Sequence, residues 1–341
     1  MSAPPASTPQ DVLVLGGAGF LGLHLIRRLQ LAGITPRVVR RRRSNVLGLR
    51  KLHVPMVVAD LDDAPSLLAA MSGQRTVFHL AGHYPKDSRT PEATLERGTR
   101  QMKTVLDSAA AAGVEHLIYV SSTATVAPAV SGPSTEHDLF PTAPAFGCYH
   151  RLKWEMEALA LAERRFRVSV ACPSACLGPG DLKVGTSALL VALARGLQPR
   201  CPDGFLSWVD VRDVAEGVYR QSVHPTPVPR VIFSAGNARL SSLMEMLGAR
   251  YGVPGATILS PAEAVELADA EEELATLGHH RAWLSREIVD LLIHSVPLSG
   301  EFATEALGLG YRPLQETLDD FDQWARRLEV IPPAVTKEAF A

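Results

Sequence analysis

The sequence predicts an α/β protein with a Rossmann-type, doubly wound parallel sheet and a smaller, mostly helical C-terminal lobe for substrate. Three observations predict this fold. Short β-rich apolar runs alternate with helical patterns through the first half, a glycine-rich turn follows the first run, and no apolar run reaches the ~18 residues that span a bilayer. With 341 residues, 46% of them hydrophobic, the chain can bury a sizeable core.

The expected strands and helices alternate in order along the chain. Strands are expected over residues 11–15, 37–39, 54–59, 76–81, 116–121 and 167–172. Helices are expected over residues 24–32, 64–71, 92–112 and 149–163, and Gly113 is a suitable cap for the third of them. Because strands and helices alternate, the sheet should be parallel and covered on both faces.

The expected domain organisation is interleaved. Residues 1–10 are rich in Pro, Ser and Ala and predict a disordered lead. Residues 11–180 predict an NADP-binding Rossmann domain, to which a segment near 205–235 returns. Residues 181–335 predict the substrate-binding lobe, over the carboxyl edge of the sheet. Within it, residues 283–296 read as an amphipathic helix on the core.

Charge and cysteine content exclude several classes of function. The net charge of −2 gives no overall field toward nucleic acid or an anionic membrane, so we expect a small-molecule substrate. The N-terminus has no basic start followed by an apolar run, which excludes a signal peptide. Cys148, Cys172, Cys176 and Cys201 match no zinc spacing, so we expect no metal and reduced thiols in a cytoplasmic protein.

The glycine-rich turn predicts a nucleotide site. Gly16, Gly19 and Gly22 follow the first strand and precede the helix expected over 24–32, and Phe20 and Leu21, between the last two glycines, are further candidate cofactor contacts. Glycines at this spacing allow a tight turn, and backbone N–H groups at the helix start can then approach a pyrophosphate. An ordinary turn is the alternative, but the strand before and the helix after favour a nucleotide.

The end of the second strand predicts which nucleotide. NAD-binding versions place an acidic residue about 20 residues after the glycines. Here Arg40 takes that place, Arg41 follows, and the run extends through Arg43. Guanidinium groups suit a 2′-phosphate, which favours NADP(H) over NAD(H). A solvated basic surface and a nucleic-acid patch are the alternatives.

Tyr149 and Lys153 are the candidate catalytic pair. Their spacing of four residues places both side chains on one face of a helix. A nearby ammonium favours the phenolate, so Tyr149 can exchange a proton with a substrate oxygen near neutral pH. The hydroxyls that end the fifth strand, from Ser121 to Thr125, can orient a substrate carbonyl or can simply cap the strand.

Taken together, these motifs resemble the extended short-chain dehydrogenase/reductase family over roughly residues 11–325. The likeness extends to Phe78–Gly82, Cys172–Gly180, Trp208–Val214 and Leu309–Pro313. It implies Thr123 as the acting hydroxyl beside Tyr149 and Lys153. It implies further cofactor contacts from Asp60, Leu61, Leu80, Ala81, Gly82, Ser121, Pro173, Ser174 and Ala175.

The branch that the sequence most resembles holds dihydroflavonol reductases, 3β-hydroxysteroid dehydrogenases and hopanoid-associated epimerase-like proteins. One departure is that Leu95 stands where the family has an Asn before Gly98-Thr99, which puts a water held by that Asn in doubt. The family also implies a homodimer that pairs through the helix bearing Tyr149 and Lys153.

The first functional hypothesis is an NADP(H)-dependent ketone reductase or secondary-alcohol dehydrogenase acting on an apolar small molecule. Candidate substrate-lining residues, for which ordinary packing is the alternative, are His83, Tyr84, Thr125, Phe140 and Trp208. A nucleotide-sugar epimerase is the second hypothesis. Residues 204–208 lack the Arg of nucleotide-sugar enzymes, and Ala124-Thr125 replaces the Asp-Glu pair of dehydratases. A non-catalytic NADP-binding protein is the third.

Overall fold

The structure is a computed structural model, and it describes residues 11–82, 90–278 and 282–333. The expected disordered lead lies outside these residues, as do the substrate-lining candidates His83 and Tyr84. Within the described part, no helix combines the length and the apolar character needed to cross a membrane.

A seven-stranded sheet forms the larger part of the molecule. Its strand order is β3-β2-β1-β4-β5-β6-β10, and every neighbouring pair is parallel. The three central strands, β1, β4 and β5, are continuous runs of buried residues, as expected where helices cover both faces. The strands are β1 (Val12–Leu15), β2 (Arg37–Arg40), β3 (Met56–Val58), β4 (Thr76–His79), β5 (His116–Val120), β6 (Arg167–Pro173) and β10 (Arg230–Phe233).

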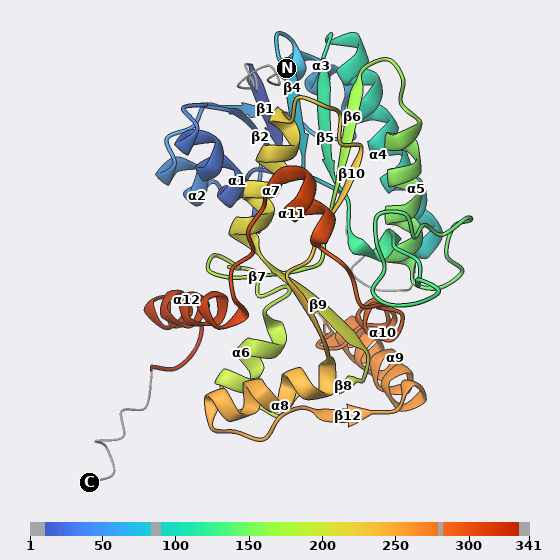
Figure 1. The fold of residues 1–341 in the computed structure, drawn as a ribbon, viewed down its shortest axis with the longest axis vertical. Coiled ribbons are helices and arrows are strands. Elements are labelled where there is room, and N and C mark those ends of the chain that lie inside the picture. Colours follow the sequence, from blue (N-terminus) through green and yellow to red (C-terminus); the bar gives the residue numbers. More distant parts are fainter. Residues whose placement is uncertain (1–10, 83–89, 279–281, 334–341) are drawn as a thin grey trace.

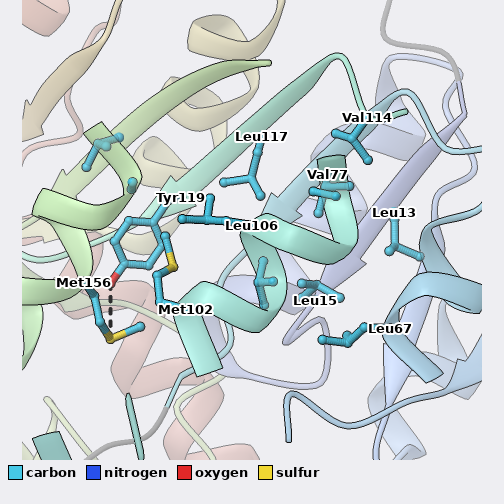
Figure 2. Packing of buried hydrophobic residues seen from close by; sticks show 14 of the residues in the cluster. Leu13, Leu15, Leu67, Val77, Met102, Leu106, Val114, Leu117, Tyr119 and Met156 are labelled. Atoms are coloured by element: carbon cyan, nitrogen blue, oxygen red, sulfur yellow. Dashed lines mark hydrogen bonds between the residues drawn. The ribbon is translucent and has the colours of Figure 1, made fainter. Parts of the chain in front are cut away.

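Helices cover both faces of this sheet (Figure 1). One face carries α3 (Ala64–Met71), α4 (Pro91–Ala111) and α5 (Cys148–Ala162), and its packing includes a hydrogen bond from the Tyr119 hydroxyl to Met156 Sδ (Figure 2). The other face carries α1 (Phe20–Leu31), α2 (Leu47–Lys51), α7 (Val211–Val223) and α11 (Glu301–Leu307).

The remaining elements gather beyond one end of the sheet, and we call them the substrate lobe after the role that the sequence predicts for residues 181–335. Two small sheets, ordered β11-β9-β7 and β12-β8, pack there with helices. The strands are β7 (Ala175–Leu177), β8 (Arg200–Pro202), β9 (Phe205–Asp210), β11 (Gly236–Arg239) and β12 (Thr257–Leu259). The helices are α6 (Ala188–Ala194), α8 (Leu240–Tyr251), α9 (Pro261–Gly278), α10 (Arg286–Ile293) and α12 (Leu314–Arg327).

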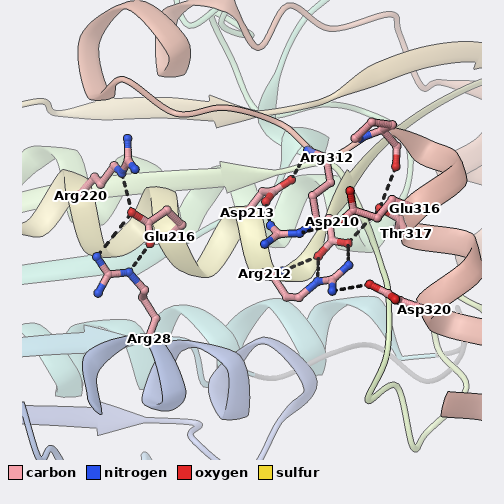
Figure 3. A network of polar contacts seen from close by, with 11 residues as sticks. Arg28, Asp210, Arg212, Asp213, Glu216, Arg220, Arg312, Glu316, Thr317 and Asp320 are labelled. Atoms are coloured by element: carbon pink, nitrogen blue, oxygen red, sulfur yellow. Dashed lines mark hydrogen bonds and ion pairs between the residues drawn. The ribbon is translucent and has the colours of Figure 1, made fainter. Parts of the chain in front are cut away.

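A polar network connects the two parts (Figure 3). Asp210, at the end of β9, accepts hydrogen bonds from Arg212 and from the Thr317 hydroxyl of α12. Arg212 also pairs with Asp320 of α12, and Asp213 accepts from Arg312. The start of α7 is therefore fixed to the C-terminal helix.

The class of fold and the six expected strands are confirmed, and the four expected helices are present, although α1 begins at Phe20, four residues before the expected start. The return segment near 205–235 is only partly as expected. β10 joins the large sheet, whereas β9 pairs with β7 and β11 in a separate sheet. A second return was not expected: α11 packs on α7 and β10. The amphipathic helix expected over 283–296 is the shorter α10, which buries Val289 and Leu292.

Candidate active site

The glycine turn is held so closely that side chains are excluded. A Cβ on Gly16 would lie 2.7 Å from the backbone nitrogen of Ala81, and Gly16 has a φ of +86°. A Cβ on Gly22 would lie 2.5 Å from the carbonyl oxygen of Gly16. Gly19 precedes α1 and offers no side-chain cap, so the first N–H groups of the helix have no such partner. This cradle fits the pyrophosphate of a dinucleotide.

The loop expected beside the nicotinamide packs against the start of α1. The Nε2 atom of His24 lies 2.8 Å from the carbonyl oxygen of Pro179. Burial lowers the pKa of His24 to about 4, so its ring is neutral and positions the loop without carrying charge. A Cβ on Gly180 would approach the Phe20 ring to 3.6 Å. Sequence reasoning missed His24, whose helical position gave no signal.

A hollow of about 490 Å³ lies where β2 and β3 end. Arg41, Arg42 and Arg43 line it together with Asp60. Its remaining lining residues are Val58, Ala59, Asp63 and Ser66. Arg40 is not among them, and its Nη1 atom lies 3.5 Å from the carbonyl oxygen of Arg41. The hollow thus brings Arg41 together with Asp60, and its lining includes Arg42 and Arg43 but not the expected Arg40.

Helix α5 brings the Tyr149 and Lys153 side chains together. Lys153 Nζ lies 5.9 Å from the centre of the Tyr149 ring and 5.4 Å from that of Tyr119. It also lies 3.5 Å from the carbonyl oxygen of Val120, at the end of β5. Burial lowers the pKa of Lys153 to about 8, an effect that the nearby Glu157 carboxylate opposes. Lys153 is therefore an ammonium that can lose its proton in mildly alkaline solution.

The hydroxyl segment divides into two roles. Ser121 and Thr125 are buried, and both hydroxyls donate to Glu157 Oε2, at 2.5 and 2.9 Å. The Thr125 hydroxyl also accepts from Arg230, so this side chain belongs to an internal network and does not line a substrate site as expected. Thr123 is half-buried in a short 3-10 turn (Thr123–Thr125) that packs against α5. The Thr123 hydroxyl, which is expected to act on the substrate, therefore lies on a turn beside α5, the helix that carries Tyr149 and Lys153.

Leu95, in place of the usual Asn, belongs to the core. Its side chain is buried between α4 and neighbouring elements, and Gly98 lets α4 approach α5, since a Cβ there would lie 2.3 Å from Leu152. A buried polar group does lie near Lys153. His79 has no hydrogen-bond partner for either ring nitrogen among the described residues, and burial lowers its pKa to about 3. Its ring is therefore neutral.

The remaining expected site residues lie where β6 ends and β7 begins (Pro173, Ser174 and Ala175), on β9 (Trp208) and in the segment before α5 (Phe140). Ser174 has a buried hydroxyl with no partner within the described ranges, while Pro173 and Ala175 flank it half-buried. A buried hydroxyl without a partner fits a bound group that would complete it. Trp208 covers Gly236 of the neighbouring strand, so its ring is used in packing. The Phe140 carbonyl accepts from Trp154 Nε1 at 3.0 Å, and its ring meets Phe146 edge-on.

Comparison with known proteins identifies a family model and relatives that this chain matches. The model of the NAD dependent epimerase/dehydratase family matches residues 12–233. A curated protein of Synechocystis sp., named "Putative dihydroflavonol 4-reductase", is 28% identical over 326 residues, which are 91% of this chain and 93% of that protein. The solved structure of gox2253 has a TM-score of 0.80 at 27% identity, and covers 94% of this chain and 100% of its own.

A more distant structure shows the fold alone. MoeE5, solved in complex with UDP-glucuronic acid and NAD, has a TM-score of 0.71 at 24% identity over 94% of this chain and 100% of its own. The same arrangement of sheet and helices therefore occurs in a protein that holds a dinucleotide.

Proposed function

Because the chain belongs to the NAD dependent epimerase/dehydratase family, we propose that it is an NADP(H)-dependent ketone reductase or secondary-alcohol dehydrogenase acting on an apolar small molecule. It is an oxidoreductase of the extended short-chain dehydrogenase/reductase type, as its relatives named as reductases and dehydrogenases indicate. Its cofactor is a nicotinamide nucleotide. We propose in addition that this cofactor is NADP(H) and that the substrate is apolar.

The close pairing of Lys153 with Tyr149 carries this proposal. An ammonium over the phenol ring favours the phenolate, so Tyr149 can give a proton to a carbonyl oxygen or take one from an alcohol. Thr123, on the turn packed against α5, donates its hydroxyl hydrogen to the same substrate oxygen and orients it. The nicotinamide, when bound, supplies or accepts the hydride.

The proposed cofactor contacts come from the segments that follow successive strands of the large sheet. Gly16, Gly19 and Gly22, with Phe20 and Leu21, hold the pyrophosphate at the start of α1. Arg41, Arg42 and Arg43 take the 2′-phosphate in the hollow beside Asp60, with Arg40 contributing charge. Further contacts come from Leu61, Leu80, Ala81, Gly82, Ser174 and the flanking Pro173 and Ala175. Ser121 supports this edge through Glu157.

An apolar substrate is favoured by the sequence at the place where nucleotide-sugar enzymes carry an Arg. Residues 204–208 lie in and before β9 and offer no cation there. Reduction of a panel of aryl alkyl ketones by the purified protein, followed through the loss of NADPH absorbance, tests the assignment. Tyr149→Phe should lower kcat by about 10²–10⁴-fold, because it removes the proton donor. Tyr219→Phe, a half-buried tyrosine on α7, serves as the control and should leave kcat unchanged.

The nucleotide released from the denatured protein provides a second measurement. Little retained nucleotide, with NADP(H) rebinding better than NAD(H), is expected of a reductase whose cofactor leaves after each turnover. Near-stoichiometric NAD⁺, with interconversion of nucleotide sugars and no ketone reduction, would identify an epimerase instead. Equal kcat in wild type and Tyr149→Phe would contradict the catalytic role of Tyr149.

A further inference from the structure

The catalytic helix begins without a cap of its own. Helix α5 starts at Cys148, and the residue before it is Gly147, which has a φ of +59° and no side chain to accept a hydrogen bond. A Cβ at this position would lie 2.5 Å from Nδ1 of His150. The packing therefore excludes Ser, Thr, Asp or Asn, the residues that usually cap a helix, and any cap must come from another element.

That cap comes from the substrate lobe. Glu287, in the first turn of α10, is buried, and its Oε2 accepts from the backbone N–H of Tyr149 at 2.9 Å. Its Oε1 atom lies 3.3 Å from the backbone nitrogen of Cys148, which also donates to it. One carboxylate thus receives two of the N–H groups that the start of a helix leaves without a partner inside the helix. Its negative charge also complements the positive end of the helix dipole.

Asp290 and His294, on the same face of α10, also lie close to the residues that precede α5. A Cβ on Gly147 would lie 3.4 Å from Cβ of Asp290, one turn beyond Glu287. His294, at the end of α10, stacks on Phe146 with ring centres 3.8 Å apart. Residues 287, 290 and 294 are spaced to lie on one side of a helix. One face of α10 therefore packs against the start of α5 from its first turn to its end. α10 in turn packs on α9, β8 and β9 of the substrate lobe.

We propose that Glu287 is a positioning residue that fixes Tyr149 from the substrate lobe through the backbone at the start of α5. This inference rests on the proposed function, because it concerns the reaction in which Tyr149 acts. Lys153 lies one turn further along α5 and has its own contact with β5, so loss of the cap should displace Tyr149 more than Lys153. The seating of the substrate lobe is then required for turnover, whereas the proposed phosphate contacts of the cofactor, at the glycine turn and in the hollow beside Asp60, lie on elements other than α5 and α10.

The test compares Glu287→Ala and Glu287→Gln with wild type in ketone reduction, NADPH binding and amide hydrogen exchange. Glu287→Ala should lower kcat about tenfold, because small displacements of a reacting group reduce rates by such factors. The Kd for NADPH should stay within about twofold, because the residue acts on the helix and not on the cofactor cradle. Glu287→Gln keeps an acceptor oxygen and should lie between the two. Exchange at the Cys148 and Tyr149 amides should accelerate in the order wild type, Gln, Ala.

A matched control is available at another helix. Glu263, in the first turn of α9, accepts from the backbone N–H of Ser260 at 2.8 Å, so Glu263→Ala removes a carboxylate from the start of a helix that does not carry Tyr149 and should leave kcat unchanged. Equal kcat and equal amide exchange in wild type and Glu287→Ala would overturn the role. A parallel loss of kcat and NADPH binding would also overturn it, since that pattern indicates general damage. If Glu287→Ala does not fold, Glu287→Gln alone decides by the same criteria.

The same measurements distinguish a failure of the proposed function from a failure of the proposed role of Glu287. A wild-type protein that binds NADPH but reduces no ketone would contradict the reductase, not the cap. In that case the exchange rates of the Cys148 and Tyr149 amides still decide whether Glu287 holds the helix start.

Discussion

The Glu157 carboxylate lies 2.6 Å from Nε of Arg230, in an ion pair that is almost entirely buried. Glu157 stands one turn beyond Lys153 on α5, and Arg230 begins β10, so the pair connects α5 to the edge strand of the sheet. Glu157 also accepts from the Ser121 and Thr125 hydroxyls. The carboxylate of Glu157 therefore links α5 to the hydroxyl segment and to β10.

Removal of one partner of this pair should destabilise the fold strongly. Arg230→Met leaves the Glu157 carboxylate buried without its cation, which lowers the free energy of unfolding by about 3–5 kcal/mol in comparable cases. Urea denaturation followed by circular dichroism measures the change. Arg75→Met is the matched control, because Arg75 and Glu115 lie 2.8 Å apart in a fully exposed pair whose loss should have little measurable effect. Similar unfolding midpoints for the two variants would contradict the importance of burial.

The arginines at the end of β2 should decide the preference between nucleotides. Replacement of both Arg41 and Arg42 by alanine removes two cations that line the hollow, so the Kd for NADP⁺ should rise by ten- to a hundredfold, on the order of 1.4–3 kcal/mol. The Kd for NAD⁺, which lacks the 2′-phosphate, should change little. Isothermal titration with both nucleotides measures the two values.

Arg50→Ala provides the control for charge alone. Arg50 is exposed on α2 and does not line the hollow. Arg50→Ala therefore removes one positive charge, as Arg41→Ala does, without altering the lining of the hollow. If Arg50→Ala weakens NADP⁺ binding as much as a single Arg41→Ala, the effect is long-range and the 2′-phosphate site lies elsewhere.

Much of the large sheet could be predicted because its signals are local. The β1 run, the glycine turn and the buried runs of β4 and β5 each lie within a few consecutive residues. The spacing of Tyr149 and Lys153 likewise requires only helical periodicity. Helix α5 therefore brought both side chains together as expected, with a shift of one residue at each end.

What could not be predicted depends on contacts between distant segments. Glu287 is separated from Tyr149 by 138 residues, and its own surroundings read only as an amphipathic helix. Thr125 was expected at the substrate as part of the hydroxyl segment, yet it is buried and contacts Glu157 and Arg230. Sequence spacing does not reveal a partner that the fold supplies from another strand. The packing of α11 on α7 and β10 was not expected for the same reason.

The glycine cradle should tolerate no methyl group at Gly22. In Gly22→Ala the new Cβ would lie 2.5 Å from the Gly16 carbonyl oxygen, so the turn must open or α1 must move. We expect NADPH binding to weaken at least tenfold and the thermal midpoint to fall by several degrees, because overpacking typically destabilises by about 1–3 kcal/mol. Fluorescence titration and thermal unfolding measure both. Gly310→Ala, where a Cβ meets nothing within 4 Å, should behave as wild type.

Lys153 should make cofactor binding sensitive to mildly alkaline pH. Its pKa is lowered by burial to about 8, so above that pH the free protein holds a neutral amine. If the bound cofactor favours the ammonium, binding must take up a proton, and the Kd for NADPH should rise by up to about tenfold between about pH 7 and about pH 9. Lys153→Arg carries a charge that does not titrate in this range, so its Kd should stay flat. A wild-type Kd that is equally flat would show that the charge of Lys153 does not contribute to binding.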